Sequence, residues 1–303
     1  MPSTTVDPAS EPERRGMRSV RISRSRAGTS SSRAAAGQGL AAALALAEQG
    51  ATSIVMTVTV ARRRTGDTTT VSSAGPGHDR RPGEVGQRMI RTDAFTVPRH
   101  VRGYPGVAFG GYVAGLLAAA SGSEQVRVDF RRTVSVDTPV VLAADGSGGA
   151  ALTDQDGAVL AEASASTVTV TPRPAPTWAQ ARAASATADV LRKMSHCYGC
   201  GAACPPGRGL RLSPWAMPTH DMVIAAWTPD LSLGGPDGLL STENVWAALD
   251  CPGGWAAMAL RDLRPGAVTA ALTATQFEPV RAGAPYLSYG WPISANGRKH
   301  RSA

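Results

Sequence analysis

Residues 106–118 read GVAFGGYVAGLLA and are apolar on nearly every face of a helix. A helix that is apolar all round is buried on all sides. A short strand candidate precedes it, and residues 126–131 then alternate in the strand period of two. Strand-like sequence continues over 133–143 and 151–171, with an Asp-Gly turn inside the last segment. The order is therefore a strand, one buried helix and an antiparallel meander.

The second part of the chain repeats this order. Strand candidates between residues 209 and 227 precede a helix candidate over 244–260, and a long strand region follows over 268–293. The matching positions after the helix are Phe130, Val134 and Pro139 in the first part, and Phe277, Val280 and Pro285 in the second. This repeat is too long for a solenoid and predicts a pair of similar units.

These patterns divide the chain into four parts. Residues 1–92 are rich in Arg, Ser, Thr and Gly without apolar periodicity, which predicts a disordered basic extension. We expect a first unit over residues 93–177, a helical linker over 178–195 and a second unit over 196–303. The last residues, from Arg298 on, are basic and not strand-like, so we expect the second unit to lack its closing strands.

One island interrupts the extension. Residues 37–58 hold a glycine turn, an Ala-Leu-rich segment and a strand candidate, and they resemble a short part of a short-chain dehydrogenase. A glycine turn binds a pyrophosphate only when a strand holds it at a helix N-terminus, and no such strand precedes these glycines. Dinucleotide binding is therefore not expected.

The charge and hydropathy patterns argue against two kinds of partner. The formal net charge is +8, but the basic excess lies in the first third of the chain, which has no interleaved aromatic residues for stacking on bases. No apolar run reaches the roughly 18 residues needed to cross a bilayer, and the start lacks the apolar core of a signal peptide. We expect a cytoplasmic protein that binds neither nucleic acid nor a membrane.

Three motifs resemble those of thioesterases. Residues 106–113 are similar to the sheet-to-helix junction in the first half of double hot-dog acyl-CoA thioesterases of type II. Residues 245–256 are similar to the central helix of the second half. The segment 197–211 resembles the opening of single-domain thioesterases of the phenylacetate-degradation type. Over residues 93–303 the resemblance implies an α+β fold of two tandem hot-dog units, each an antiparallel sheet wrapped around one buried helix.

The resemblance also implies catalytic residues for hydrolysis of an acyl-CoA-type thioester. An acidic residue on the second central helix does this work in the family, and Asp250 matches its place among apolar neighbours that would desolvate it. A helix N-cap or structural carboxylate that binds backbone amides near Pro252 and Gly253 is the alternative. A hydroxyl on the next strand orients water in the family, and Thr269 lies nearest the family spacing, ahead of Thr273 and Thr275. Gln276 is a further catalytic candidate.

Two glycine pairs, Gly110-Gly111 and Gly253-Gly254, are candidates for substrate binding. Bare backbone N–H groups at a helix N-terminus can polarise the carbonyl of a thioester. Close packing of a helix also requires residues without side chains, so both interpretations of these glycines stay open.

The cysteines offer a weaker pattern. Cys197, Cys200 and Cys204 follow His196, while Cys251 lies far along the chain. A structural zinc site usually has two cysteine pairs, and only one C-x-x-C is present. We therefore expect small buried thiols in a tight turn, and no metal or other cofactor. A nucleophilic Cys251 would need a histidine, and none is close in sequence.

The function that the sequence favours is thioester hydrolysis, with an acyl-CoA-type small molecule as ligand. A non-catalytic hot-dog pair that binds acyl groups or a protein partner is the alternative, and a homo-oligomer could form through the sheets. A hydratase would require an Asp-His arrangement that the central helices lack. In some family members the closing strand carries a catalytic amide, so its expected loss here bears on activity.

Overall fold

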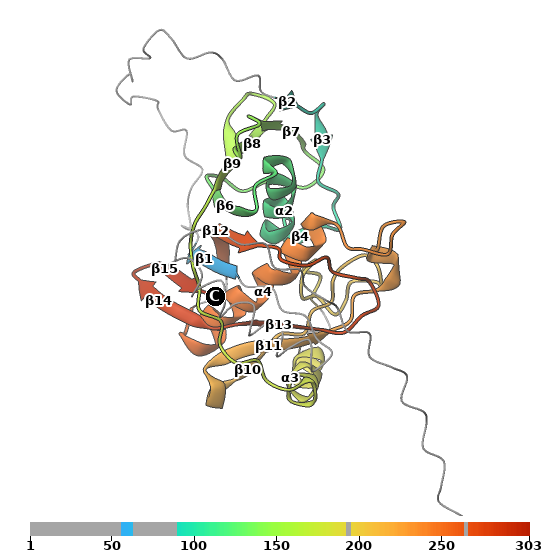
Figure 1. Ribbon diagram of the computed structural model, residues 1–303, viewed down its shortest axis with the longest axis vertical. Helices are drawn as coiled ribbons and strands as arrows, with labels where there is room; N and C mark the ends of the chain where they lie inside the picture. The colour runs from blue at the N-terminus through green and yellow to red at the C-terminus, as the bar shows by residue number, and fades with distance from the viewer. Residues whose placement is uncertain (1–55, 63–89, 192–194, 264–265) are drawn as a thin grey trace, which may run out of the picture.

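The computed structural model describes residues 56–62, 90–191, 195–263 and 266–303. These residues form an α+β structure in which antiparallel sheets surround two central helices, α2 (Gly110–Ser121) and α4 (Thr242–Leu260). The two helices pack against each other near the middle of the molecule (Figure 1). With one sheet-wrapped helix in each half, this arrangement confirms the tandem hot-dog fold expected from the sequence.

The first unit wraps its sheet around α2. Across the sheet the strands are β6 (Gln125–Phe130), β9 (Val159–Ala165), β8 (Ala150–Asp154) and β7 (Pro139–Ala144), with the short β2 (Ile90–Arg91) and β3 (Phe95–Thr96) on the outer side of β7. A small hairpin of β4 (Arg102–Tyr104) and β5 (Val107–Ala108) leads into the helix. Val113 and Leu117 of α2 are fully buried, as the all-apolar sequence of this helix requires.

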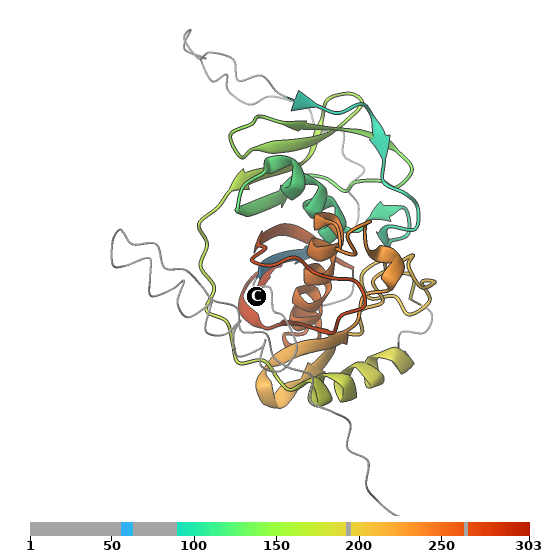
Figure 2. The ribbon, with the colours of Figure 1, turned by 45° about the vertical axis from the view of Figure 1, so that its right-hand side comes forward.

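The second unit surrounds α4 with strands from two sheets. One sheet consists of β10 (Trp215–Met217), β11 (Met222–Trp227) and β13 (Tyr286–Gly290), and the other receives β12 (Ala267–Thr275), β14 (Pro292–Asn296) and β15 (Lys299–Ser302). Two 3₁₀ turns lie at Pro218–His220 and Leu231–Leu233. The expected linker contains helix α3 (Trp178–Leu191), which packs on β11 at the lower edge of the molecule in Figure 2.

The two units share one continuous sheet. Strands β6 and β12 pair directly in antiparallel fashion, with Val128 opposite Leu272. Both side chains are fully buried and belong to the same hydrophobic core as the residues of α2 and α4. The junction is therefore part of the core, and the units do not meet only through a surface.

Strand β1 (Met56–Arg62) comes from the part of the chain that we expected to be disordered. It lies between β12 and β15 and is antiparallel to both, with Val60 opposite Thr269 and Val58 opposite Ser302. In the second unit β1 is next to β12, just as in the first unit β9 is next to β6. The expectation of disorder is wrong for these residues and for β2, whereas residues 1–55 and 63–89 lie outside the described part of the chain.

The pairing of β1 also bears on the dehydrogenase-like island. Both neighbours of β1 are antiparallel to it, whereas the strands of a dinucleotide-binding unit are parallel. The glycines at 37 and 39 lie outside the described residues.

The second unit has the closing hairpin that we expected to be missing. Strand β15 pairs with β14 on one side and with β1 on the other. A turn at Gly297, whose φ is 55°, connects β14 to β15. The expectation that residues 298–303 form no strand was wrong because the inward positions of β15 are His300 and Ser302, so no apolar alternation marks the strand. The two residues between the strands, Gly297 and Arg298, form a two-residue hairpin loop that begins with glycine, and this glycine was the available signal.

No helix in the described part of the chain is long and apolar enough to cross a membrane.

The position of β1 predicts that a proline in it destabilises the second unit. Val58 lies between Leu272 and Ser302 in the sheet, and Val58→Pro removes a backbone donor from a strand that has partners on both sides. We expect a loss of about 1–3 kcal/mol in the free energy of unfolding, measured by urea denaturation. Val58→Thr is the matched control because it keeps the N–H group and the β-branch. Equal stability of the proline and threonine variants would contradict the placement of β1.

Candidate active site

The site forms where α2 and α4 cross at close range. A Cβ atom added at Gly111 would lie 2.8 Å from Cα of Ala247, and one added at Gly115 would overlap Cα of Glu243. Gly111 and Gly115 are four residues apart, as are Glu243 and Ala247, so one face of each helix meets the other backbone to backbone. Only glycine permits this approach, which answers the question left open for Gly111 in favour of close packing.

Asp250 of α4 lies at this crossing and is 5% exposed. Its Oδ1 accepts a hydrogen bond from the Thr269 hydroxyl of β12 at 2.7 Å, and its Oδ2 accepts one from the Gly111 N–H of α2 at 2.8 Å. Burial raises the pKa of the Asp250 carboxyl to about 6, against the opposing effect of these two hydrogen bonds. The structure thus brings three residues predicted from sequence into one hydrogen-bonded group.

The same carboxylate completes the N-terminus of α2. The N-cap residue of this helix, Phe109, makes no side-chain capping bond, and the first turn contains no acidic residue. The first N–H groups of a helix have no acceptor within it, and a negative charge there is favourable. Asp250, from the other unit, supplies both the acceptor and the negative charge. Its structural role is therefore to cap α2 at Gly111 and not to bind the amides near Pro252.

A proline sits in α4 just after Asp250. Pro252 has no N–H group, so it cannot donate to the carbonyl of Ala248 one turn earlier. The buried hydroxyl of Ser288 on β13 donates to this carbonyl at 2.7 Å. The strand therefore replaces the missing helical hydrogen bond and fixes the part of α4 that carries Asp250.

Asp250 and Thr269 open onto a cavity of about 690 Å³, within the size range of small-molecule sites. Its wall is mostly apolar and includes Phe109, Val113, Phe130, Trp255, Met258 and Leu263. Polar groups in the wall are few, and among them are the exposed Arg131 and Arg132. An apolar cavity with one buried carboxylate and flanking cations suits an elongated apolar ligand with an anionic end.

The other predicted residues divide into two groups. Gly110 and Gly254 line the cavity. Gly253 packs against β13, where a Cβ atom at Gly290 would lie 3.1 Å from the Gly253 nitrogen. Gln276 is not part of the cavity wall, and its side-chain amide donates to the carbonyl of Glu278 at 3.3 Å.

Thr273 and Thr275 are also outside the cavity wall, although both are buried. The Thr275 hydroxyl accepts a hydrogen bond from Gln125 at 2.8 Å. Of the three threonines weighed on this strand, only Thr269 contacts Asp250.

Two features of the cavity were not predicted from sequence. Tyr104 of β4 lines it and donates its hydroxyl to the carbonyl of Ala267 at 2.8 Å. Cys251 lies in the wall next to Cys197 and Cys200, and hydrogen bonding to these thiols, with burial, raises the pKa of the Cys251 thiol well above its usual value. A protonated thiol is a poor nucleophile, and no histidine is among the described residues of the wall.

The sequence matches no protein family, and comparison with curated proteins gives no match. Among solved structures, the chain is similar to a TesB protein of Mycobacterium avium subsp. paratuberculosis, with 14% identity and a TM-score of 0.44 over 73% of this chain and 93% of that one. It is similar to a Lactobacillus plantarum protein described as an oleoyl thioesterase, with 10% identity and a TM-score of 0.41 over 72% and 95%. It is also similar to a Novosphingobium aromaticivorans protein described as a thioesterase, with 13% identity and a TM-score of 0.37 over 69% of this chain and 91% of that one.

The helix crossing predicts that Gly115→Ala destabilises the protein. The new methyl group would overlap the backbone of α4 at Glu243, which cannot move as a side chain can. We expect a loss of about 1–3 kcal/mol or more in the free energy of unfolding, as for overpacked cores. Gly254→Ala is the control: its Cβ meets nothing within 4 Å, and alanine favours a helix interior by roughly 0.5–1 kcal/mol. A neutral Gly115→Ala variant would rule out the close crossing.

The Ser288 contact predicts a specific coupling with Pro252. Ser288→Ala leaves the Ala248 carbonyl without its hydroxyl donor and is expected to cost about 1–3 kcal/mol. In a Pro252→Ala background the new N–H can donate to the same carbonyl, so the loss of Ser288 should cost less. Chemical denaturation of the four proteins of this double-mutant cycle measures the coupling. Additive effects would show that Ser288 does not replace the helical bond.

Proposed function

We propose that this chain hydrolyses thioesters of the acyl-CoA type in the cavity beside α2 and α4. The observation that carries the proposal is the Asp250 carboxylate, which is buried, bonded to Thr269 and located in the wall of a large apolar cavity. Removing an ionisable group from water is costly and is typical of groups that take part in chemistry.

In the proposed reaction Asp250 acts as general base. A water molecule beside its carboxylate gives up a proton to Asp250 while its oxygen attacks the thioester carbonyl carbon. The C–S bond then breaks, and the thiolate leaving group takes the proton back from Asp250. Thr269 fixes the orientation of the carboxylate through the 2.7 Å hydrogen bond to Oδ1.

Gly110 is the proposed donor to the thioester oxygen. The N–H of Gly111 is already bonded to Asp250, but Gly110 is the first residue of α2, and its N–H has no acceptor within the helix. It lines the cavity, and a Cβ atom there would lie 3.3 Å from Oδ2 of Asp250. A substrate carbonyl at this amide would thus be next to the base, and the helix N-terminus would stabilise its developing negative charge.

The rest of the cavity supports the substrate class. Phe130, Trp255 and Met258 offer an apolar surface for an acyl chain. Arg131 and Arg132 at the same cavity suit the phosphates of a coenzyme A moiety, because guanidinium groups bind phosphate well. Arg131 is paired with Glu162 on the surface, and this exposed pair contributes little to stability.

A non-catalytic acyl-binding function is the second candidate. Both carboxylate oxygens of Asp250 already have partners within the protein, as a structural cap would. The family resemblance implies a catalytic amide on the closing strand in some members, yet in the closing hairpin of β14 and β15 the one side-chain amide, Asn296, is exposed and is not part of the cavity wall. These two observations are the support for this second candidate.

The test separates the two roles of Asp250. Asp250→Asn keeps an oxygen for the Gly111 N–H but loses the basic carboxylate, so the fold should persist while kcat falls by about 10²–10⁴-fold. Release of free CoA from acyl-CoAs of different chain lengths is measured by chromatography, which avoids interference from the protein's own thiols. Thr269→Val should lower kcat less.

Thr275→Val is the matched control, since its hydroxyl is on the same strand but outside the cavity. Unchanged turnover by Asp250→Asn would exclude Asp250 as the base. If the wild-type chain hydrolyses none of the acyl-CoAs but its melting temperature rises with them, the binding function is correct instead.

A further inference from the structure

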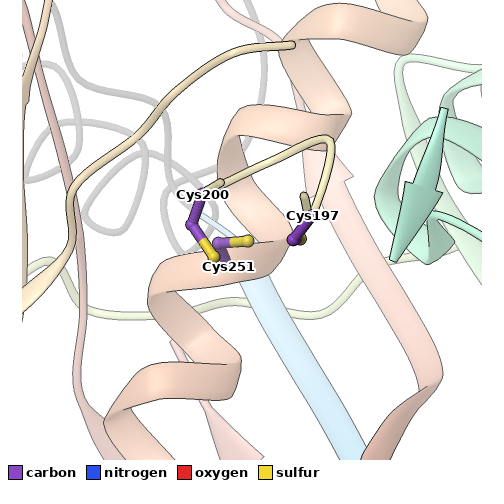
Figure 3. A group of neighbouring side chains, drawn as sticks. All are labelled: Cys197, Cys200 and Cys251. Atoms are coloured by element: carbon purple, nitrogen blue, oxygen red, sulfur yellow. The ribbon is translucent and has the colours of Figure 1, made fainter. Parts of the chain in front are cut away.

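Three cysteines meet in the wall of the cavity. Cys197 and Cys200 lie on one turn, and Cys251 projects from α4 between them (Figure 3). Their Sγ atoms all lie within 4.8 Å of one another, and none of the three forms a disulfide. Cys200 and Cys251 are buried and Cys197 is half-buried. The turn and the helix are far apart in sequence: Tyr198 of the turn and Asn244 of α4, which are hydrogen-bonded, are 46 residues apart. Folding therefore creates this cluster.

The turn that carries two of these cysteines is held firmly. The N–H of Gly201 donates to the carbonyl of Cys197 at 2.7 Å, and the N–H of Tyr198 donates to that of Arg102 on β4 at 2.7 Å. The Tyr198 hydroxyl donates to Asn244 on α4 at 2.6 Å. These bonds attach the turn to both units, so the positions of Cys197 and Cys200 relative to α4 are set by the fold.

The contact between the turn and α4 leaves no room for another side chain. A Cβ atom at Gly199 would lie 2.6 Å from Sγ of Cys251 and 2.7 Å from the Phe109 ring. Glycine between the two cysteines therefore lets the third thiol reach them.

We propose that Cys197, Cys200 and Cys251 bind a zinc ion as thiolates, with the fourth coordination position open to the cavity. At a Zn–S distance of about 2.3 Å a tetrahedral site places its sulfur atoms about 3.8 Å apart, so separations within 4.8 Å require only small inward shifts. All three residues line the cavity, where water or a ligand thiol can complete the tetrahedron. Three protein ligands with an open position are typical of zinc sites that exchange a ligand.

The chemistry of the site balances without a redox step. Each thiol loses its proton when its sulfur binds the metal, so one zinc ion displaces up to three protons and leaves a complex with one net negative charge. Zinc joins the turn at 197–200 to α4 and thereby supports the wall of the cavity. The proposed hydrolysis at Asp250 does not pass through the metal, and the two proposals stand or fall separately.

The test uses the untagged full-length chain, reduced and freed of metal by a chelator. We expect it to take up one zinc ion per chain, to melt at a higher temperature with zinc, and to give with Co²⁺ the intense sulfur-to-metal absorption of a thiolate site. Loss of a residue that only hydrogen-bonds to a metal ligand lowers metal affinity by roughly 10–100-fold. Cys251→Ser and Cys200→Ser each remove a ligand itself, so each should lower the zinc affinity by more than this.

Cys204→Ser is the matched control. Cys204 lies in the same segment, but its thiol donates to the carbonyl of Cys197 at 3.4 Å and is not part of the cluster. It should bind zinc like the wild type. Any of three results would overturn the proposal. The reduced wild-type chain binds neither zinc nor Co²⁺, or Cys204→Ser loses as much zinc affinity as the other two variants, or the three cysteines form a disulfide and take up no metal once it is reduced. Because the wild-type measurement decides, a variant that misfolds does not obscure the result.

Discussion

The backbone contact of α2 and α4 at Gly111 and Gly115 is the constraint on which the rest of this structure depends. Since the helices touch without side chains between them, a short carboxylate on α4 can reach the first turn of α2. The same proximity lets the sheets of the two units join at β6 and β12. The cavity lies at the end of this crossing, where the N-terminus of one helix faces the middle of the other.

Asp250 therefore serves stability and, in our proposal, chemistry with the same two oxygens. Its hydrogen bonds to Thr269 and Gly111 favour the charged form, while burial opposes it, and the balance leaves the pKa of this carboxyl at about 6. A carboxyl with this pKa is still mostly ionised at neutral pH and more basic than an exposed aspartate, as general-base catalysis requires. Substitutions that remove the oxygens would disturb both roles, whereas an isosteric amide separates them.

The sequence was informative where local pattern decides structure. The apolar run at 106–118 predicts a buried helix, and Asp250 with Thr269 could be paired from family spacing. Long-range pairing could not be predicted from the sequence, because strands distant along the chain supply the backbone partners of β1 and β15. Strand β15 has no apolar alternation, and the alternation of β1 lies within a segment whose composition predicted disorder. For the same reason the sequence did not place Cys251 beside Cys197 and Cys200. Gln276 directly follows the strand that carries Thr269, but it bonds to Glu278 and is not part of the cavity wall.

The position of β1 has a consequence for how the chain folds during synthesis. Strand β1 (Met56–Arg62) is paired on one side with β15 (Lys299–Ser302), so the second unit cannot close until β15 has been synthesised (Figure 1). Until then the edge of β1 that faces β15 is unpaired, and an unpaired strand edge can associate with other chains. Pairing between strands this far apart in sequence also carries a loop-closure cost and slows folding. We expect the first unit to fold early around α2 and to serve as the template on which β12, β1 and β15 later assemble.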